Sequence, residues 1–320
     1  MNKKIILVTG GGGFIGTNLV RTLQLQYKVV VVDNFQTGNF DQIFSISDQN
    51  QTKILEGNIC DDDTIEKVVD LGPYDFILHL ACPASPPKYQ IDQLDTLETN
   101  FVGTRNILNV AKKMGSRIVI ASTSEVYGDP NVNPQPETYR GNVNTLGPRA
   151  CYDEGKRIAE TLCYVFREQF GVNVGLVRIF NTYGPYMDIN DGRVVTSFIK
   201  SMMTNSPVEI YGDGSQTRSL CFVDDLIVGL QTYLFSDLHL PINLGCDKEI
   251  TIKYLAELIS SLANQQLVVS YKNLPVDDPK QRRPDLTQAI KYLNWNPKFS
   301  LEQGLELTYN FFNKKYENSR

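Results

Sequence analysis

The feature that most constrains this chain is a glycine-rich loop between a strand-like run and a helix-like run near the N-terminus. Residues 4–9 are almost continuously apolar and rich in β-branched side chains, which is typical of a strand buried on both faces. Gly10, Gly13 and Gly16 follow, and residues 17–23 have a helical pattern. Such a loop lets the backbone approach a pyrophosphate while the helix N-terminus receives its charge. We therefore predict a dinucleotide-binding unit.

A second strand, over residues 28–33, ends in Asp33, which follows the glycines by about 20 residues, as the dinucleotide fingerprint requires. The Asp33 carboxylate is expected to accept hydrogen bonds from the hydroxyls of the adenosine ribose. The same negative charge would repel a 2′-phosphate, and no arginine immediately follows Asp33. NAD is therefore favoured over NADP as the cofactor.

Strand-like and helix-like stretches continue to alternate up to residue 184. Strands are predicted at 53–59, 74–81, 117–122 and 173–180, with a long helix from Thr96 to Met114. The proline-rich stretch 82–87 is predicted to be a loop that is neither helix nor strand. This alternation predicts an α/β fold with a doubly wound parallel sheet of the Rossmann type.

Beyond residue 184 the pattern changes, because strands become short, as at 208–211, and turns become more frequent. We interpret this part as a smaller C-terminal domain that binds the substrate. Residues 222–235 and 242–245 are expected to return to the first domain. The predicted NAD-binding domain comprises residues 1–184 and about 217–245, and the substrate-binding domain comprises about 185–216 and 246–320.

Tyr152 and Lys156 are four residues apart in a helix predicted to continue to about residue 170, so they share one face. A nearby ammonium is expected to lower the pKa of the phenol and make it a general base. Thr123, Ser124 and Glu125 follow the strand at 117–122. They are expected beside the nicotinamide, because ligands bind at the carboxyl ends of parallel strands.

Composition narrows the classes of function. The net charge of -5 argues against a general role in binding nucleic acid or a membrane surface. Six cysteines without a CxxC pair and only two histidines leave no spacing typical of a metal site, and His79 is expected in or beside the core. No leader-like or long apolar stretch is apparent. We therefore expect a cytoplasmic protein with reduced cysteines.

Together these motifs resemble the extended short-chain dehydrogenase/reductases that act on nucleotide sugars. Several longer stretches are similar, more specifically, to the UDP-glucuronic acid decarboxylase (UDP-xylose synthase) family, and the resemblance spans essentially the whole chain. These stretches are residues 83–89, 122–130, 147–157, 178–185, 190–195, 214–218 and 277–279. Related dehydratases carry an acidic residue at the position of Ser124, so dehydration is disfavoured here.

The resemblance implies a redox-neutral decarboxylation of UDP-glucuronate to UDP-xylose. Tyr152 would take the proton of the 4-hydroxyl while hydride passes from C4 to NAD. Lys156 and Thr123 would assist it, Lys156 by holding the phenolate and the nicotinamide ribose. The 4-keto sugar is a β-keto acid that loses CO2, and reprotonation at C5 and return of the hydride complete the cycle. Glu125 would orient the sugar or act on a water, and Arg282 would contact the substrate near its carboxylate and deliver the C5 proton.

The resemblance also implies two sets of binding residues. For substrate, Arg218 and Asn181 would hold the pyrophosphate and Tyr211 would flank the uracil, while Ser85, Glu125, Arg149, Arg193, Gln216 and Arg282 complete that set. The implied cofactor-binding residues are Gly10, Gly13, Phe14, Ile15, Asp33, Asn34, Thr37, Gly38, Asn58, Ile59, Leu80, Ala81, Thr99, Ala121, Tyr152 and Lys156.

Three alternatives stay open, and one position departs from the family. The substrate could instead be a 2-acetamido UDP-uronic acid, the enzyme could be an NAD-dependent UDP-sugar 4-epimerase, or the chain could be a non-catalytic NAD-sensing scaffold. Glu98 stands where the family usually has lysine, so sugar recognition is expected to differ there. The resemblance further implies a homodimer through a contact of the helix at about 96–114 and the helix that carries Tyr152. The apolar Ile107, Leu108 and Val110 on the first helix are compatible with that contact and equally with the core.

Overall fold

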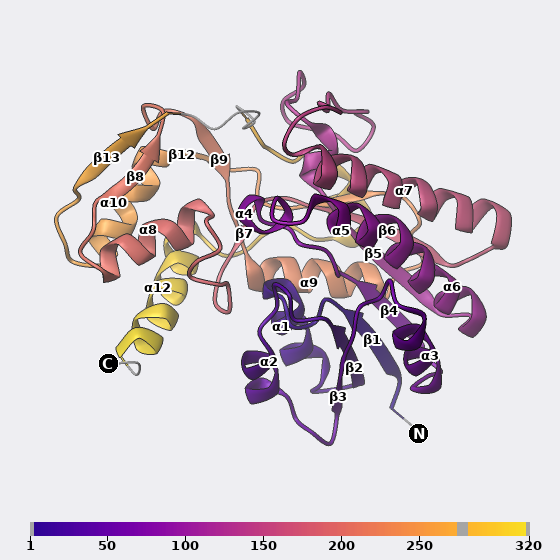
Figure 1. The fold of residues 1–320 in the computed structure, drawn as a ribbon. Helices are drawn as coiled ribbons and strands as arrows, with labels where there is room; N and C mark the ends of the chain where they lie inside the picture. The colour runs from indigo at the N-terminus through magenta and orange to yellow at the C-terminus, as the bar shows by residue number, and fades with distance from the viewer. Residues whose placement is uncertain (1–2, 274–280, 318–320) are drawn as a thin grey trace.

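The computed structural model describes residues 3–273 and 281–317 and has a seven-stranded parallel sheet at its centre (Figure 1). The strand order β11-β6-β5-β4-β1-β2-β3 has its switch point between β1 and β4, which confirms the doubly wound Rossmann fold. The strands are β1 (Ile5–Thr9), β2 (Lys28–Asp33), β3 (Thr52–Glu56), β4 (Phe76–His79), β5 (Arg117–Thr123), β6 (Val174–Ile179) and β11 (Ile242–Leu244).

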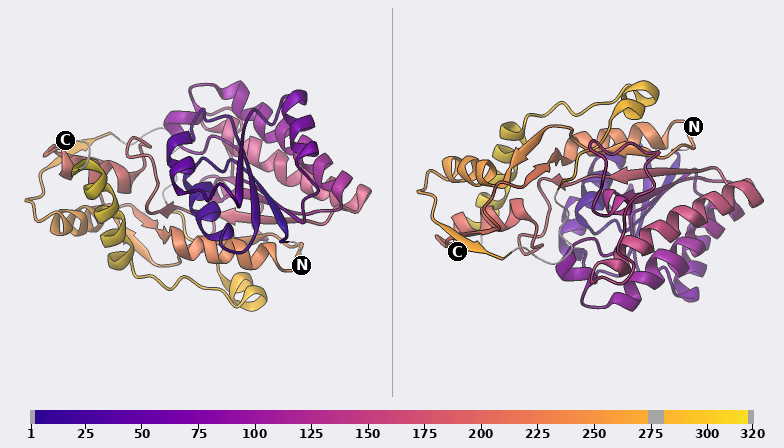
Figure 2. Two further views of the ribbon diagram at one scale, coloured as in Figure 1. Left: turned by 90° about the horizontal axis from the view of Figure 1, so that it is seen from below. Right: turned by 90° about the horizontal axis from the view of Figure 1, so that it is seen from above.

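Helices cover both faces of this sheet, as the two views of Figure 2 show. One face packs against α1 (Phe14–Leu23), α2 (Phe40–Ile46) and α9 (Val223–Leu234), and the other against α3 (Asp62–Asp70), α6 (Thr104–Met114) and α7 (Ala150–Phe170). Neighbouring strand residues alternate between the two cores: Ile6 and Val8 belong to the first, and Leu7 belongs to the second. Burial on both faces explains the continuous apolar runs in the sequence.

His79 lies in the core, as expected. Its ring nitrogens contact the hydroxyls of Thr9, at 2.7 Å, and Thr104, at 3.0 Å. Burial lowers the pKa of His79 to about 3, so the ring is neutral and structural at physiological pH.

The long helix expected from Thr96 to Met114 is in fact three consecutive helical segments. It starts earlier, with α5 (Gln93–Glu98), because the Asp92 carboxylate accepts a hydrogen bond from the N–H of Asp95 at 2.9 Å. A five-residue π-helix, η1 (Thr99–Gly103), joins α5 to α6. The π segment widens one turn, which the i, i+4 pattern of the sequence does not reveal.

The expectation of an irregular loop at 82–87 is wrong at its end. A short helix, α4 (Pro86–Tyr89), begins with two prolines at its first positions. Proline is well tolerated there, because its missing N–H has no partner in the first turn and its fixed φ suits a helix.

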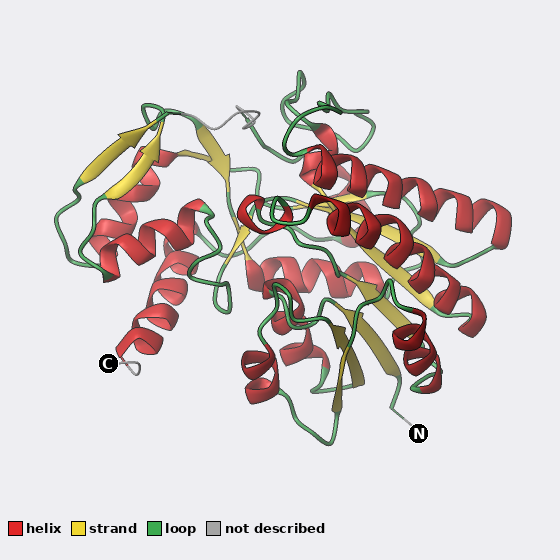
Figure 3. Cartoon of the chain, in the orientation of Figure 1, coloured by secondary structure: helices red, strands yellow, loops and turns green. Residues whose placement is uncertain are grey.

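The remaining elements form a smaller unit beside the sheet, seen at the left of Figures 1 and 3. Helices α8 (Val194–Met203), α10 (Ile252–Leu262) and α12 (Leu301–Glu317) pack on one another. Strand β8 (Val208–Tyr211) pairs with β13 (Val269–Lys272), and β9 (Thr217–Ser219) pairs with β12 (Glu249–Thr251). Strand β11 returns to the main sheet beside β6, as predicted. The division into two domains stays a prediction, and the motif at 277–279 lies outside the described residues. The other short elements of the chain are η2 (Ser124–Tyr127), β7 (Thr182–Tyr183), β10 (Cys221–Phe222) and α11 (Thr287–Leu293).

None of the helices within residues 3–273 and 281–317 combines the length and the apolar character needed to cross a membrane.

Candidate active site

A large cavity of about 1060 Å³ lies between the carboxyl ends of the sheet strands and the smaller C-terminal unit. This volume is at the upper end of the usual range for small-molecule sites, which leaves room for a dinucleotide and a second ligand. Every residue predicted to bind cofactor or substrate, or to act in catalysis, lines this cavity. The structure therefore brings all of them together, while their individual roles remain predictions.

The glycine loop forms one end of the cavity and fits a dinucleotide phosphate. Gly10 has a φ of +72°, and a Cβ there would lie 2.7 Å from the backbone nitrogen of Ala81, so only glycine is accommodated. Gly13 is the N-cap of α1 and provides no side-chain cap. Because Gly13, Phe14 and Ile15 line the cavity, the unsatisfied N–H groups of the first turn are available to an anion.

Asp33 lies at the end of β2 in the same wall. Its carboxylate accepts hydrogen bonds from the backbone N–H of Gly12, at 2.9 Å, and of Phe35, at 2.8 Å. Burial raises the pKa of Asp33, and these two bonds oppose the rise. The bonds fix the carboxylate beside the glycine loop, where an adenosine ribose is expected.

Tyr152 and Lys156 lie in the first turns of α7 and are both buried, each 6% exposed. The Lys156 ammonium donates a hydrogen bond to the carbonyl oxygen of Ala121 at 2.9 Å and lies 5.9 Å from the centroid of the Tyr152 ring. Burial raises the pKa of Tyr152 above its usual range, and a hydrogen bond with Thr123 offsets only part of the rise. The expected lowering of this pKa is therefore wrong for the chain alone, because burial has the largest influence on it.

Tyr89 is a site residue whose role the sequence did not indicate, although it lies in the proline-rich motif at 83–89. Its ring stacks on that of Tyr152, with centroids 5.0 Å apart and planes inclined by 6°. The hydroxyls of Tyr89 and Ser85 are buried in the cavity wall and have no hydrogen-bond partner within residues 3–273 and 281–317. Buried hydroxyls normally have partners, so these two mark places for polar groups of a ligand.

Glu125 is held between two arginines at the end of β5. Its Oε2 atom lies 2.6 Å from a guanidinium nitrogen of Arg149 and 2.8 Å from one of Arg282. Burial alone would raise the pKa of Glu125, but Arg282 and Arg149 outweigh burial and hold the pKa below its usual range. Glu125 is therefore ionised at neutral pH and cannot itself donate a proton.

Arg282 reaches this place from the C-terminal part of the chain and is almost fully buried, at 2% exposed. Besides Glu125, its guanidinium donates hydrogen bonds to the carbonyl oxygens of Ser124, at 3.0 Å, and Gly128, at 2.7 Å. These bonds fix the guanidinium in the cavity wall, where it contributes a localised positive charge.

Asp153 lies behind this group of charges. Burial and the charge of Glu125 raise the pKa of Asp153, against the opposing effect of Arg149 and Arg282. Its Oδ1 atom is buried without a hydrogen-bond partner in the described part of the chain. Asp153 does not line the cavity, so we assign it no contact with substrate.

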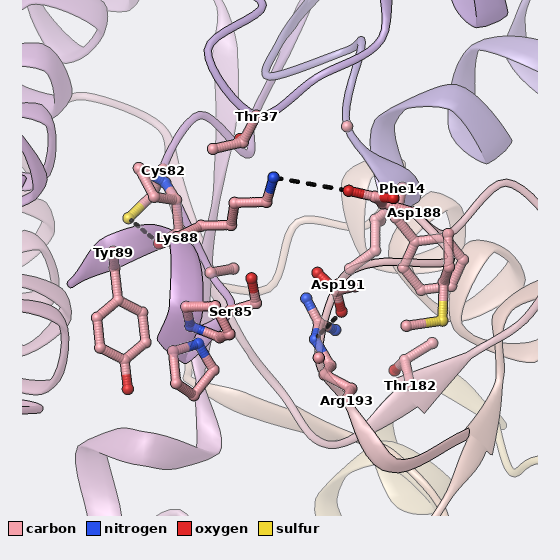
Figure 4. A pocket seen from close by; sticks show the side chains of 18 of the residues that line it. Phe14, Thr37, Cys82, Ser85, Lys88, Tyr89, Thr182, Asp188, Asp191 and Arg193 are labelled. Carbon is pink, nitrogen blue, oxygen red and sulfur yellow. Dashed lines mark hydrogen bonds and ion pairs between the residues drawn. The ribbon is translucent and has the colours of Figure 1, made fainter. Parts of the chain in front are cut away.

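Two further ion pairs belong to the cavity lining and are drawn in Figure 4. Lys88 lies 3.6 Å from Asp188, and Arg193 lies 2.7 Å from Asp191. The Lys88 pair joins α4 to the segment that follows β7, and this segment also contacts α1, because the side chain of Asn18 donates a hydrogen bond to the carbonyl oxygen of Pro185. Of these four residues only Arg193 was predicted from the sequence. Asp191 lies in the motif at 190–195, but no role was predicted for it.

Glu98 does not have the position expected of it. It is the last residue of α5 and does not line the cavity, whereas the next residue, Thr99, does. Burial is the largest cause of the raised pKa values of Asp95 and Cys60, and the charge of Glu98 adds to both. The exchange of lysine for glutamate therefore lies outside the wall that would contact the sugar, and the expected change in sugar recognition has no structural basis.

The fold and this cavity define an enzyme of the extended short-chain dehydrogenase/reductase class, and the NAD dependent epimerase/dehydratase family model matches residues 6–239. UDP-glucuronic acid decarboxylase 1 from Danio rerio is 44% identical over 317 residues, which cover 99% of this chain and 74% of the relative. UDP-glucuronic acid decarboxylase 5 from Arabidopsis thaliana is 44% identical over 304 residues, which cover 94% of this chain and 87% of the relative. The chain belongs to the UDP-glucuronic acid decarboxylase family.

Solved structures show the same fold over nearly the whole chain. A UDP-glucose 4-epimerase from Thermotoga maritima, solved with UDP-glucose, has a TM-score of 0.90 at 29% identity and covers 97% of this chain and 99% of its own. A UDP-glucuronic acid 4-epimerase from Bacillus cereus, in complex with UDP-glucuronic acid and NAD, has a TM-score of 0.86 at 26% identity and covers 98% and 100%. These structures confirm the predicted fold class.

Proposed function

We propose that this chain decarboxylates UDP-glucuronate to UDP-xylose in a redox-neutral reaction that uses bound NAD. The observation that carries the proposal is the position of Glu125, Arg149 and Arg282 in the same cavity as Tyr152 and Lys156. A tyrosine–lysine pair suits oxidation at a hydroxyl, and a buried and a partly buried arginine suit a substrate that brings a carboxylate.

The residues that would hold NAD are the glycine loop, Asp33 and the lining residues predicted for it. The uncapped N-terminus of α1 would bind the pyrophosphate, and the fixed carboxylate of Asp33 would accept the ribose hydroxyls. When bound, NAD supplies the hydride acceptor for C4 and a positive charge near the reacting centre. Lys156, already bonded to the carbonyl of Ala121, would donate its remaining N–H groups to the nicotinamide ribose and the tyrosine.

Tyr152 would remove the proton of the sugar 4-hydroxyl. Thr123 is bonded to the Tyr152 hydroxyl and would hold the substrate oxygen in the same place. The 4-keto sugar is a β-keto acid, so loss of CO2 requires only that the new negative charge on the carbonyl oxygen be stabilised. The O–H of Tyr152 and the hydroxyl of Thr123 would provide this stabilisation in a water-poor site.

The substrate carboxylate would lie against donors that have no partner among the described residues. These are the hydroxyls of Ser85 and Tyr89 and the buried Nε atom of Arg149. Arg282 adds positive charge to the same wall and keeps Glu125 ionised. Because these groups bind negative charge, the site favours a substrate that arrives with a carboxylate. Departure of CO2 then takes the carboxylate, and so its negative charge, away from these groups.

The UDP part would bind toward the smaller unit. Tyr211, at the end of β8, is 44% exposed and would flank the uracil. Arg218 on β9 and Asn181 before β7 would hold the pyrophosphate, together with Arg193 and Gln216, which also line this side of the cavity. This assignment supports the predicted division into an NAD-binding and a nucleotide-sugar-binding domain.

We further propose a homodimer in the cytoplasm. The support for a dimer is the set of apolar side chains exposed on α5, η1 and α7: Leu94, Leu97, Phe101, Ile158 and Tyr164. The apolar Ile107, Leu108 and Val110 of α6 lie in the core, so they do not contribute to this surface. The support for a reducing compartment is that all six cysteines are unpaired. Sedimentation of the purified protein tests the dimer.

The experiment that tests the proposed function is incubation with UDP-glucuronate and NAD, followed by mass spectrometry of the nucleotide sugar. We expect loss of CO2 and a product with the mass of UDP-xylose. The 4-epimerase alternative predicts a product with the mass of the substrate. The 2-acetamido alternative predicts that the acetamido uronic acid, and not UDP-glucuronate, is decarboxylated. The alternative of a non-catalytic NAD-sensing scaffold predicts no product from UDP-glucuronate or from the acetamido uronic acid.

A further inference from the structure

Residues 281–285 bring Arg282 to the site, and the buried Gln135 is bonded to them through its backbone and its side chain. The backbone N–H of Gln135 donates to the carbonyl of Arg283 at 2.8 Å, and its carbonyl accepts from the N–H of Asp285 at 3.0 Å. Gln135 therefore pairs with this segment like one residue of an added strand, in a bridge to Pro284. The contact begins one residue after Arg282.

The side chain of Gln135 adds one hydrogen bond to this attachment and a second that fixes the side chain itself. Its Oε1 atom accepts a hydrogen bond from the N–H of Arg283 at 2.8 Å, and its Nε2 atom donates to the carbonyl of Val132 at 2.7 Å. The residue is fully buried, at 0% exposed. No other neutral side chain of equal length both donates and accepts a hydrogen bond in this way, so this buried position specifically requires glutamine.

Asn243 links the same place to the element that carries Glu125. Its Nδ2 atom donates to the carbonyls of Gln135, at 2.9 Å, and Asp285, at 3.2 Å. Its Oδ1 atom accepts from the hydroxyl of Tyr127 at 2.8 Å. Since Tyr127 and Glu125 both belong to η2, the network connects the two sides of the Glu125–Arg282 ion pair.

We propose that Gln135 is a positioning residue that sets the place of Arg282 and, through it, of the Glu125 carboxylate. The inference rests on the proposed function, in which this ion pair serves the decarboxylation half of the cycle. Tyr152 and Lys156 are positioned separately, on α7 and through the carbonyl of Ala121. A change at Gln135 therefore acts on CO2 loss and not on oxidation at C4.

The test compares Gln135→Met with Gln24→Met. Methionine keeps the length and burial of glutamine but cannot make either side-chain hydrogen bond. Gln24 is a matched control, because it is also buried and bonds the backbone of a distant segment, at Ile46 and Asp48, away from the cavity. In single turnovers with NAD and UDP-glucuronate, nicotinamide reduction and CO2 release are measured separately, and amide hydrogen exchange reports the attachment of residues 281–285.

In Gln135→Met we expect CO2 release to slow by about tenfold or more, as for a displaced catalytic group. Nicotinamide reduction should stay within about threefold of the wild type, and exchange at 281–285 should accelerate. Gln24→Met should leave the ratio of the two rates unchanged. Equal slowing of both steps, or no change in either, would overturn the inference. If Gln135→Met does not fold, Gln135→Glu keeps the acceptor for Arg283 and loses only the donor to Val132, so it should shift the ratio in the same direction by a smaller factor.

Arg282→Ala separates this inference from the proposed function. If Arg282→Ala loses CO2 release but Gln135→Met does not, the positioning role fails alone. If Arg282→Ala releases CO2 at the wild-type rate, the proposed role of the ion pair fails. In that case, faster amide hydrogen exchange at residues 281–285 in Gln135→Met would still show that Gln135 attaches this segment.

Discussion

The rings of Tyr89 and Tyr152 lie parallel, with centroids 5.0 Å apart, so the proline-rich segment is stacked directly on the general base. The stack buries both rings and leaves the Tyr89 hydroxyl in the cavity wall without a partner in the described chain. Tyr89 thus has two separable properties, an aromatic face that packs on Tyr152 and a free donor.

Tyr89→Phe keeps the stack and removes only the hydroxyl. If this hydroxyl binds the substrate carboxylate, its loss costs about 1.5–3 kcal/mol, and KM for UDP-glucuronate rises by about tenfold or more. Tyr89→Leu also removes the stack and should lower kcat as well. Steady-state kinetics separates the two effects, and an unchanged KM in Tyr89→Phe would exclude the hydroxyl from binding.

Glu125→Gln removes the charge between Arg149 and Arg282 and leaves the buried Arg282 and the partly buried Arg149 without a counter-charge. Breaking a buried ion pair in this way costs about 3–5 kcal/mol. We therefore expect a large drop in the free energy of unfolding, measured by urea denaturation. Glu168→Gln is the comparison, because the Glu168–Arg167 pair is exposed and should contribute less than about 1 kcal/mol. Equal effects of the two substitutions would contradict this account of Glu125.

Gly10→Ala tests the close approach of the glycine loop to the loop that follows β4. The added Cβ would meet the backbone of Ala81 at 2.7 Å, in addition to the left-handed φ. We expect a loss of about 3 kcal/mol or more of stability and loss of NAD binding. Gly115 has a similar φ of +68° with nothing within 4 Å of a Cβ, so Gly115→Ala should cost only about 1–2 kcal/mol. Thermal unfolding and NAD titration compare the two variants.

Asp153 makes stability depend on pH in a direction opposite to that of most carboxylates. Burial first, and then Glu125, raise the pKa of Asp153 to about 7, whereas an unfolded aspartate titrates near about 4. Between these values the folded chain binds a proton that the unfolded chain has lost, so this group's contribution to stability falls as pH rises through the window.

Asp153→Asn lacks this titration and should gain stability relative to the wild type as pH rises from 5 to 8. We expect a change of about 1–3 kcal/mol in the difference between the two unfolding free energies over that range. Urea denaturation at several pH values measures this difference. A difference that does not vary with pH would show that Asp153 is ionised in the folded protein throughout.

The sequence predicted the gathering of the site residues because of one geometric property of the fold. Gly10, Asp33, Ala81 and Thr123 all end or follow parallel strands, and such strands present their carboxyl ends at one edge of the sheet. Local patterns were therefore sufficient to place these residues in one cavity.

Other features depend on packing between distant residues and could not be predicted in this way. The raised pKa of Tyr152 results from its burial under Tyr89, which no local pattern reports. Glu125 finds its partners 24 and 157 residues away, so its ionised state depends on the tertiary fold. The π-helix η1 and the position of Glu98 outside the cavity follow equally from packing and not from helix periodicity.

The central claim is that one hydride leaves C4 and returns to it while CO2 is lost from C5. The most direct measurement uses UDP-glucuronate that carries deuterium at C4, with CO2 and the nucleotide sugar analysed together. We predict one CO2 for each UDP-xylose formed, with the deuterium retained at C4. A product that keeps its carboxylate, or UDP-xylose that has lost the deuterium, would contradict the account.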